Sequence, residues 1–238
     1  MPSAEYKPPT RAVYDSRVRV ILPMVLSCAL VAMTGLQTIA VSAQAPRTAR
    51  GRLFPPEKLG ELEVRDRDEW QEPDRIMDAL GIADGARVAD IGAGGGWFTV
   101  RMARRVGPNG RVYAEDVQRQ MIESIERRVQ RENLRNVETI LGTFTDPRLP
   151  SNLAAVLIVD TYPQIDDRIL MLKHMAAALS PNGRLGIVDF KKDSFGPGPA
   201  MNERLEPDVI IRDAGRAGLK LQAHHKFLRY QYLLVFTL

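Results

Sequence analysis

The sequence predicts an α/β domain: an open, mostly parallel sheet of seven strands, with helices on both faces and an antiparallel hairpin at the C-terminus. Between residues 86 and 190, short apolar runs of strand character alternate with segments of helical periodicity. Consecutive parallel strands need crossover connections, and helices of this length supply them. The last two apolar runs, 219–228 and 230–238, are separated only near Arg229, which indicates a hairpin.

The expected elements follow in a regular order. A helix enters at Pro73 and stops at Gly81, and two Pro-Asn-Gly turns, 108–110 and 181–183, each precede a strand. The other expected helices are 97–107, 118–133, 166–180 and 207–218. The expected strands are 86–92, 111–116, 136–142, 153–160 and 184–190, followed by the two strands of the hairpin.

The first 45 residues are expected to be a signal peptide or an N-terminal membrane anchor. An apolar run between Arg19 and Pro46 follows several basic residues and ends in small residues, which is typical of a secretory leader. The run also suits an uncleaved span, which needs about 20 apolar residues. Lipidation at Cys28 is a third alternative. These readings predict a periplasmic or secreted protein after cleavage, or a membrane-anchored one, with a linker over 46–65 and the domain over 66–238.

Charge and cysteine content exclude several function classes. Residues 1–52 hold seven of the 33 Lys and Arg and two of the 29 Asp and Glu, so 26 basic and 27 acidic residues remain, a net charge of −1. A nearly neutral domain whose arginines alternate with acids does not indicate nucleic-acid binding. Cys28 is the only cysteine, and the three histidines are scattered. The domain therefore offers no cysteine nucleophile, and no metal site is expected.

The segment "DIGAGGGW", residues 90–97, joins the first strand to the next helix. In an open parallel sheet, this turn borders the crevice where ligands bind. Glycines there allow positive φ angles and close approach of a ligand to the backbone. The dinucleotide fingerprint G-x-G-x-x-G would require a glycine at 97, where the sequence has Trp97.

The pattern that is present, D-x-G-x-G-x-G from Asp90, Gly92, Gly94 and Gly96, resembles motif I of the class I methyltransferases. The resemblance implies a Rossmann-like sheet and S-adenosylmethionine as cofactor. An acid beside the loop suits this cofactor, which carries an ammonium and a sulfonium and no phosphate. The segments "DEWQEPDRI", "LIVDTYPQI", "IVDFKK" and "YQYLLVF" are similar to small bacterial methyltransferases with a secretory-type leader, of the type 11 and quinone-biosynthesis branch.

Asp116 ends the second strand, 20 residues after Gly96, and is the expected acceptor of the two ribose hydroxyls. An acid at this distance indicates a ribose rather than one particular cofactor. Glu115 is the alternative, although strand alternation should turn its side chain to the other face.

The resemblance also implies roles after the third and fourth strands. Gly142, Thr143 and Phe144 would flank the adenine, although the family commonly has an acid at the position of Thr143. Phe144 has simple core packing as its alternative. Asp160, with Thr161, would lie under the methionine end.

Methyl transfer needs positioning and exclusion of water, and a base only if the acceptor loses a proton. "DTYP" at 160–163 stands where enzymes acting on exocyclic amines have "NPPY", so the acceptor is expected to be an oxygen, nitrogen or carbon of a small molecule. Tyr162 and Asp189 are the candidate catalytic residues. Lys191 and Lys192 are expected to be solvated. Two other functions remain open: a non-catalytic module that binds S-adenosylmethionine or a nucleoside, and a nucleotide-dependent oxidoreductase.

Overall fold

The computed structural model describes residues 53–238. The expected leader, its Cys28 and the first part of the expected linker lie outside these residues. Within the described part, none of the helices combines the length and the apolar character that crossing a membrane requires.

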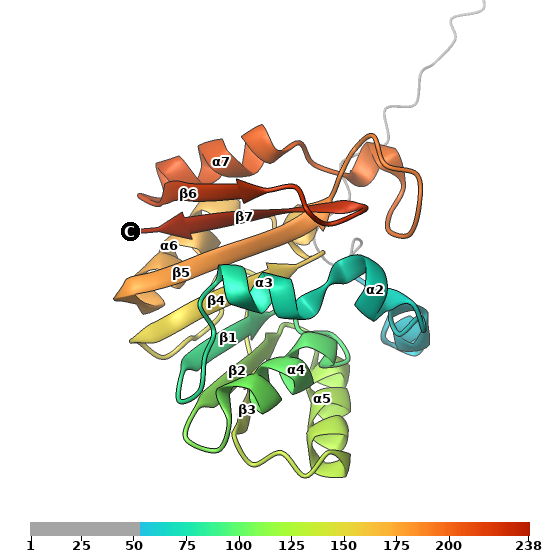
Figure 1. Cartoon of the computed structure of the whole chain (residues 1–238), viewed down its shortest axis with the longest axis vertical. Coiled ribbons are helices and arrows are strands. Elements are labelled where there is room, and N and C mark those ends of the chain that lie inside the picture. The colour runs from blue at the N-terminus through green and yellow to red at the C-terminus, as the bar shows by residue number, and fades with distance from the viewer. Residues whose placement is uncertain (1–52) are drawn as a thin grey trace, which may run out of the picture. The chain divides into compact units, whose positions relative to one another are not determined.

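The sheet has the predicted architecture (Figure 1). Its strand order is β3-β2-β1-β4-β5-β7-β6; the pairs among β1 to β5 are parallel, and β7 runs antiparallel to both β5 and β6. The strands are β1 Arg87–Ile91, β2 Arg111–Asp116, β3 Val137–Leu141, β4 Leu153–Val159, β5 Leu179–Phe190, β6 Lys220–His225 and β7 Gln231–Thr237. The α-helices are α2 Arg67–Gln71, α3 Pro73–Ala79, α4 Trp97–Val106, α5 Arg119–Arg131, α6 Arg168–Ala178 and α7 Pro207–Arg216. Three short 3-10 helices are η1 Pro56–Leu62, η2 Tyr162–Gln164 and η3 Met201–Glu203.

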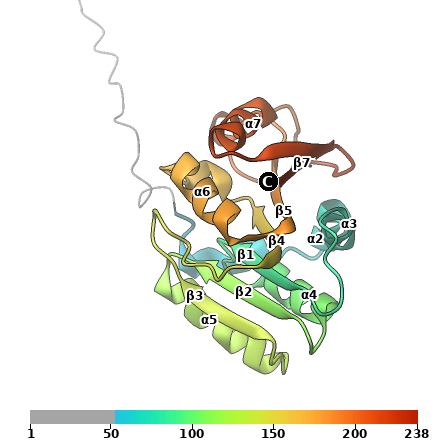
Figure 2. The same ribbon diagram turned by 90° about the vertical axis from the view of Figure 1, so that its left-hand side faces the viewer.

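Two apolar layers hold the helices on the sheet. In β1, Val88 packs in one layer with residues of α3 and α4, whereas Ala89 and Ile91 pack in the other with residues of α6 and α7. This alternation is what a strand covered on both faces requires. Figure 2 shows α6 and α7 separated from α3 and α4 across the sheet.

The second Pro-Asn-Gly segment differs from the prediction. Residues 181–183 do not form a turn before the strand, because β5 already begins at Leu179 and pairs there with Leu153. The register shifts between this pair and the next one, Ala155 with Arg184. A Cβ at Gly183 would lie 2.6 Å from the Leu153 carbonyl oxygen, so a glycine fits this irregularity. The hairpin connection is also longer than expected, from Lys226 to Tyr230.

The strand order reverses beside β1, which has β2 on one side and β4 on the other. The connections from β1 and β4 leave toward opposite halves of the sheet, so a crevice opens at the carboxyl ends of these strands. The glycine-rich turn follows β1 directly and therefore borders this crevice.

Candidate functional site

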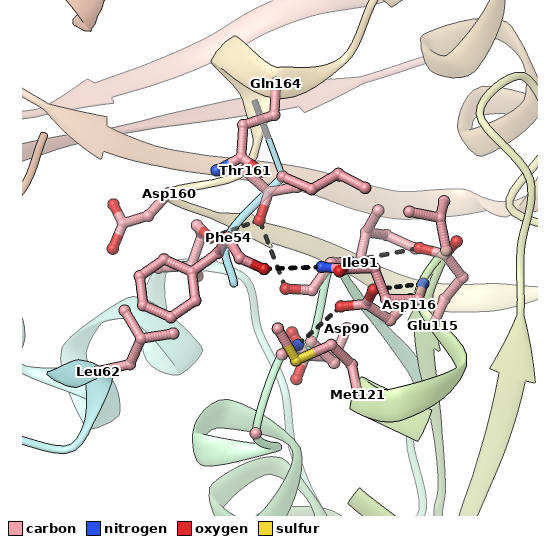
Figure 3. Close-up of a pocket in the computed structure, with 18 of the residues that line it drawn as sticks. Phe54, Leu62, Asp90, Ile91, Glu115, Asp116, Met121, Asp160, Thr161 and Gln164 are labelled. Carbon is pink, nitrogen blue, oxygen red and sulfur yellow. Dashed lines mark hydrogen bonds between the residues drawn. The ribbon is translucent and has the colours of Figure 1, made fainter. Parts of the chain in front are cut away.

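A pocket lies at the carboxyl ends of β1, β2 and β4 (Figure 3). Four of its lining residues are acids that end or follow these strands: Asp90, Glu115, Asp116 and Asp160. The apolar lining includes Phe54, Leu59, Leu62, Met121, Phe144 and Ile165. In the close-up, Phe54 and Leu62 lie on one side of the cavity, and Glu115 and Asp116 lie on the other.

Three of the four glycines in the turn after β1 each have their own structural reason. Gly92, Gly94 and Gly96 have φ angles of 64°, 55° and 78°, a region that favours glycine. A Cβ at Gly92 would lie 2.4 Å from Thr161 Cγ2, whereas one at Gly94 would meet only Leu62 Cδ1, at 3.9 Å. Gly94 therefore exposes bare backbone to the pocket. Gly96 caps α4 and packs against Ile125, and it does not line the pocket.

Asp116 lines the pocket at the end of β2, as the sequence predicted, with 6% of its surface exposed. Its two carboxylate oxygens accept hydrogen bonds from the backbone N–H groups of Gly94, at 3.0 Å, and Gln118, at 2.9 Å. Burial raises its pKa, and these two bonds oppose the rise. The carboxylate thus connects the glycine loop to the start of α5.

Glu115 also lines the pocket, contrary to the argument from strand alternation. The cavity lies beyond the strand ends, so side chains of both faces reach it. Glu115 Oε2 accepts from the Gly92 N–H at 3.3 Å, and a Cβ at Gly142 would overlap Oε1. Burial, and then the charge of Asp116, raise the pKa of Glu115 to about 8. At neutral pH this carboxyl group therefore holds a proton.

Asp90 and Asp160 are the other two acids at these strand ends. Asp90 is 3% exposed and accepts from the Thr99 hydroxyl at 2.6 Å. Asp160 follows β4 with a φ of 57°, unusual for a residue other than glycine. Burial raises the pKa of each to about 6, and for Asp160 the nearby Arg67 opposes the rise. Both are mainly ionised at neutral pH.

Sequence reasoning missed the segment 53–71, here named the cover, which runs across η1 and α2. Its described residues 53–65 fall within the expected linker, yet five of them line the pocket: Leu53, Phe54, Leu59, Leu62 and Glu63. The Gln118 amide donates to the Phe54 carbonyl at 3.1 Å, and ion pairs join Glu63 to Arg128 and Asp68 to Arg101. Leu59 and Leu62 alone form too short an apolar pattern to show from the sequence that this segment packs on the domain.

Arg67, also in the cover, brings a positive charge into the acidic pocket. Its guanidinium lies 4.3 Å from the centre of the Trp97 ring and donates to the Leu62 carbonyl at 2.6 Å. Burial lowers its pKa, and the charge of Asp160 opposes the change. The guanidinium remains protonated in proteins.

The predicted adenine-flanking residues separate in the structure. Phe144 lines the pocket, but Thr143 does not. The Thr143 hydroxyl instead accepts from the Asp146 N–H at 2.9 Å, so it closes the turn after β3. Thr161 lines the pocket and donates to the Val159 carbonyl at 3.0 Å.

Neither candidate catalytic residue lines the pocket. Tyr162 is fully buried, and its hydroxyl donates to Asp213 on α7 at 3.2 Å. Asp189 is 1% exposed, and its Oδ1 accepts from the Phe190 N–H at 2.7 Å. Tyr162 lies in η2 just after β4, whereas Asp189 lies within β5, and both side chains are in the protein interior. Lys192 is exposed as expected, whereas Lys191 is half-buried and donates to the Leu228 carbonyl at 2.6 Å.

A strand order of 3-2-1-4-5-7-6 with a glycine loop after β1 and an acid at the end of β2 defines the class I methyltransferase fold. Residues 88–183 match the family model described as a methyltransferase domain. The described part of the chain thus has the class I methyltransferase fold that the resemblance implied, and residues 88–183 are similar to known methyltransferase domains. The secretory-type leader lies outside the described residues.

Known proteins agree with this assignment. A solved S-adenosylmethionine-dependent methyltransferase from Aquifex aeolicus aligns with a TM-score of 0.74 at 24% identity, over 78% of this chain and 100% of that one. The ubiquinone/menaquinone biosynthesis C-methyltransferase UbiE of Pasteurella multocida is 31% identical over 51% of this chain and 46% of its own length. A demethylmenaquinone methyltransferase from Geobacillus is 28% identical, over 49% of each chain. The chain thus spans about half the length of these curated relatives.

Proposed function

We propose that this protein transfers the methyl group of S-adenosylmethionine to an oxygen, nitrogen or carbon of a small molecule. The observation that carries the proposal is one pocket in which a bare glycine backbone faces four carboxyl groups, at the carboxyl ends of the strands of a methyltransferase domain. The relatives named as methyltransferases support it.

The residues present fit this cofactor. A dinucleotide would bring an anionic pyrophosphate beside Asp90 and Asp116, where repulsion is strong in a partly desolvated site. A sulfonium nucleoside instead brings positive charge to the acids. Gly94 leaves open the space that a side chain would fill.

Five described residues are suited to hold the cofactor. The Asp116 carboxylate would accept from the ribose hydroxyls, and Phe144 and Met121 would pack on the adenine. Arg67 would bind the carboxylate of the methionine end, because a guanidinium forms strong paired hydrogen bonds with a carboxylate. Asp160 would attract the positive charge at the same end.

When bound, the cofactor supplies a methyl carbon that its sulfonium has already activated. That methyl carbon would be available to the acceptor atom, with Arg67 and Asp160 holding the methionine end of the cofactor. The protein contributes alignment along one axis and exclusion of water. Its cover suits the second task, since Phe54, Leu59 and Leu62 place apolar groups over the pocket.

Calorimetry with S-adenosylmethionine and with NAD tests the cofactor, and transfer of a labelled methyl group to a panel of phenols, amines and quinols tests the reaction. Micromolar binding of S-adenosylmethionine together with transfer is expected. Binding without transfer to any acceptor would favour the non-catalytic module, and binding of NAD alone would favour the oxidoreductase.

For the N-terminus we propose the leader that its apolar run indicates, either cleaved near Ala43 or Ala45 or retained as an anchor. The cofactor is made in the cytoplasm, so a retained anchor with the domain on that side suits the proposed reaction better. Sequencing the N-terminus of the mature protein, with fractionation of membranes, distinguishes the two forms.

A further inference from the structure

A chain of hydrogen bonds links the cover to the carboxyl end of β4. Arg67 Nε donates to Gln71 Oε1 at 2.6 Å, and Gln71 Nε2 donates to Gln231 Oε1 at 2.9 Å. Gln231 Nε2 then donates to Asp160 Oδ1 at 2.5 Å, while Gln71 Nε2 also approaches Asp160 Oδ2 at 3.4 Å. Three elements distant in sequence, α2, β4 and β7, therefore meet in one network.

The orientation of both amides is fixed by the two charged ends. Arg67 can only donate, so the oxygen of Gln71 must face it and the nitrogen must face inward. The Gln71 nitrogen in turn requires the oxygen of Gln231, which leaves the Gln231 nitrogen for Asp160. Both glutamines are 0% exposed, so reversing either amide would leave buried polar groups unpaired.

Among the titratable groups that surround Asp160, Asp160 itself is the one that carries the negative charge at neutral pH. Arg67 faces it from α2, Asp189 from β5 and Tyr232 from β7. Burial, and then Asp160 itself, raise the pKa of Asp189 to about 8, and burial raises the pKa of Tyr232. Both neighbours are therefore neutral at pH 7, and the negative charge stays on Asp160, which lines the pocket.

We propose that Gln71 and Gln231 are positioning residues that hold the Asp160 carboxylate ionised against the pocket and so make this site select positively charged sulfur nucleosides. The inference rests on the proposed function. It assigns a purpose to two fully buried glutamines that do not themselves line the pocket.

Gln231→Leu tests the proposal, with Kd measured by calorimetry for three probes. S-adenosylmethionine carries an ammonium and a sulfonium, S-adenosylhomocysteine only the ammonium, and methylthioadenosine neither. Because the Gln231 bond lowers the pKa of Asp160, its loss lets a proton bind near neutral pH. A rise of about one pKa unit from the wild-type value of about 6 lowers the ionised fraction of Asp160 at pH 7 from about 0.9 to about 0.5, so the variant should bind S-adenosylmethionine about twofold more weakly at pH 7 and about fivefold more weakly near pH 6. Methylthioadenosine should bind unchanged.

The pH profile separates this role from simple loss of structure. Both measurements are made from pH 5.5 to 8.5, and the ratio of variant to wild-type Kd is taken at each pH. The ratio should be largest near and below the wild-type pKa of about 6 and fall toward pH 8.5, where Asp160 ionises in both proteins. Gln71→Leu should behave alike. Asn136→Ala removes another buried amide, which donates to Ala103 and Gly107 away from the pocket, and should leave all three Kd values unchanged.

Weaker binding of both charged probes would identify the ammonium as the group that Asp160 attracts, and weaker binding of S-adenosylmethionine alone would identify the sulfonium; each supports the proposal. An equal loss for all three probes, no loss, or a ratio independent of pH would overturn it. If wild type binds neither S-adenosylmethionine nor S-adenosylhomocysteine, the proposed function fails, and this inference fails with it.

Discussion

Asp116→Asn replaces one carboxylate oxygen in the pocket with an amide nitrogen and keeps the shape of the side chain. In the wild type, each carboxylate oxygen accepts one backbone hydrogen bond, from Gly94 or from Gln118. A carboxylate has about four acceptor positions, so each oxygen retains one for a ribose hydroxyl. The asparagine oxygen can keep the Gln118 bond, but its nitrogen then meets the Gly94 N–H as donor against donor.

The magnitude follows from this geometry. The variant loses the hydrogen bond from one ribose hydroxyl to a charged acceptor, which is worth about 1.5–3 kcal/mol, and weakens the bond from the other hydroxyl. We therefore expect the Kd for S-adenosylmethionine to rise about 30-fold, or about 2 kcal/mol. Calorimetry at pH 7.5 measures it. Asp78→Asn, which removes an ion pair with Arg105 on the surface, is the control and should change the Kd by less than about twofold.

A Kd within about threefold of wild type, with an unchanged melting temperature, would refute the assignment of Asp116 to the ribose. Glu115, the neighbouring acid, would then be the candidate acceptor of the ribose hydroxyls.

Three further substitutions test the pocket. Glu115→Gln should raise the melting temperature at pH 8. The wild-type carboxyl group keeps its proton up to about pH 8, whereas the unfolded chain has lost it, so wild-type stability falls as pH rises from about 4.5 to 8. Equal wild-type melting temperatures at pH 5 and pH 8 would contradict this. Gly94→Ala should abolish binding, whereas Gly85→Ala, with a φ of 76° and open space around it, should cost only about 1 kcal/mol of stability; equal effects on binding would show that Gly94 does not face the ligand. Arg67→Met should weaken S-adenosylmethionine binding about tenfold and spare methylthioadenosine. Arg104→Met, which removes an exposed guanidinium paired with Glu132 and outside the pocket lining, should change neither Kd; matching losses in the two arginine variants would indicate a general loss of structure rather than of charge in the pocket.

The fold could be predicted from the sequence because each layer of it has a local pattern. Apolar runs of strand length alternate with helical periodicity, and the glycine loop marks the first strand. The two failures in the fold, at 181–183 and in the hairpin connection, both concern ends of strands. There the pairing of Leu179 with Leu153 decided the boundary, and local turn propensity did not.

The site was predictable mainly where its residues end a strand or lie within a few residues of its carboxyl end. Asp90, Gly94, Asp116 and Asp160 line the pocket because the carboxyl ends of parallel strands share one edge of the sheet. Tyr162, only two residues beyond Asp160, already turns inward to Asp213. The spacing of residues in the sequence does not predict this change in side-chain direction.

The cover was hidden from sequence reasoning for a different reason. Its contacts with the pocket join residues about 30 or more positions apart, as in Arg67 over Trp97, and the bond from Gln118 to the Phe54 carbonyl spans 64 positions. A segment with few apolar residues and two prolines, Pro55 and Pro56, reads as a linker unless the surface that it packs on is known.

The electrostatics of the pocket bring these parts together. Asp90, Glu115, Asp116 and Asp160 all have raised pKa values, and in each case burial is the largest cause. Keeping several acids in a poorly solvated cavity costs stability, and a protein selected for stability alone would replace them with apolar residues. Their cost is offset when a cation enters, because the same desolvation that raises each pKa strengthens the attraction of the carboxylate to positive charge. Arg67 supplies part of that charge from the cover, at the end of the network that orients Asp160. A positively charged nucleoside would supply the rest, so its binding would offset the cost of burying these acids.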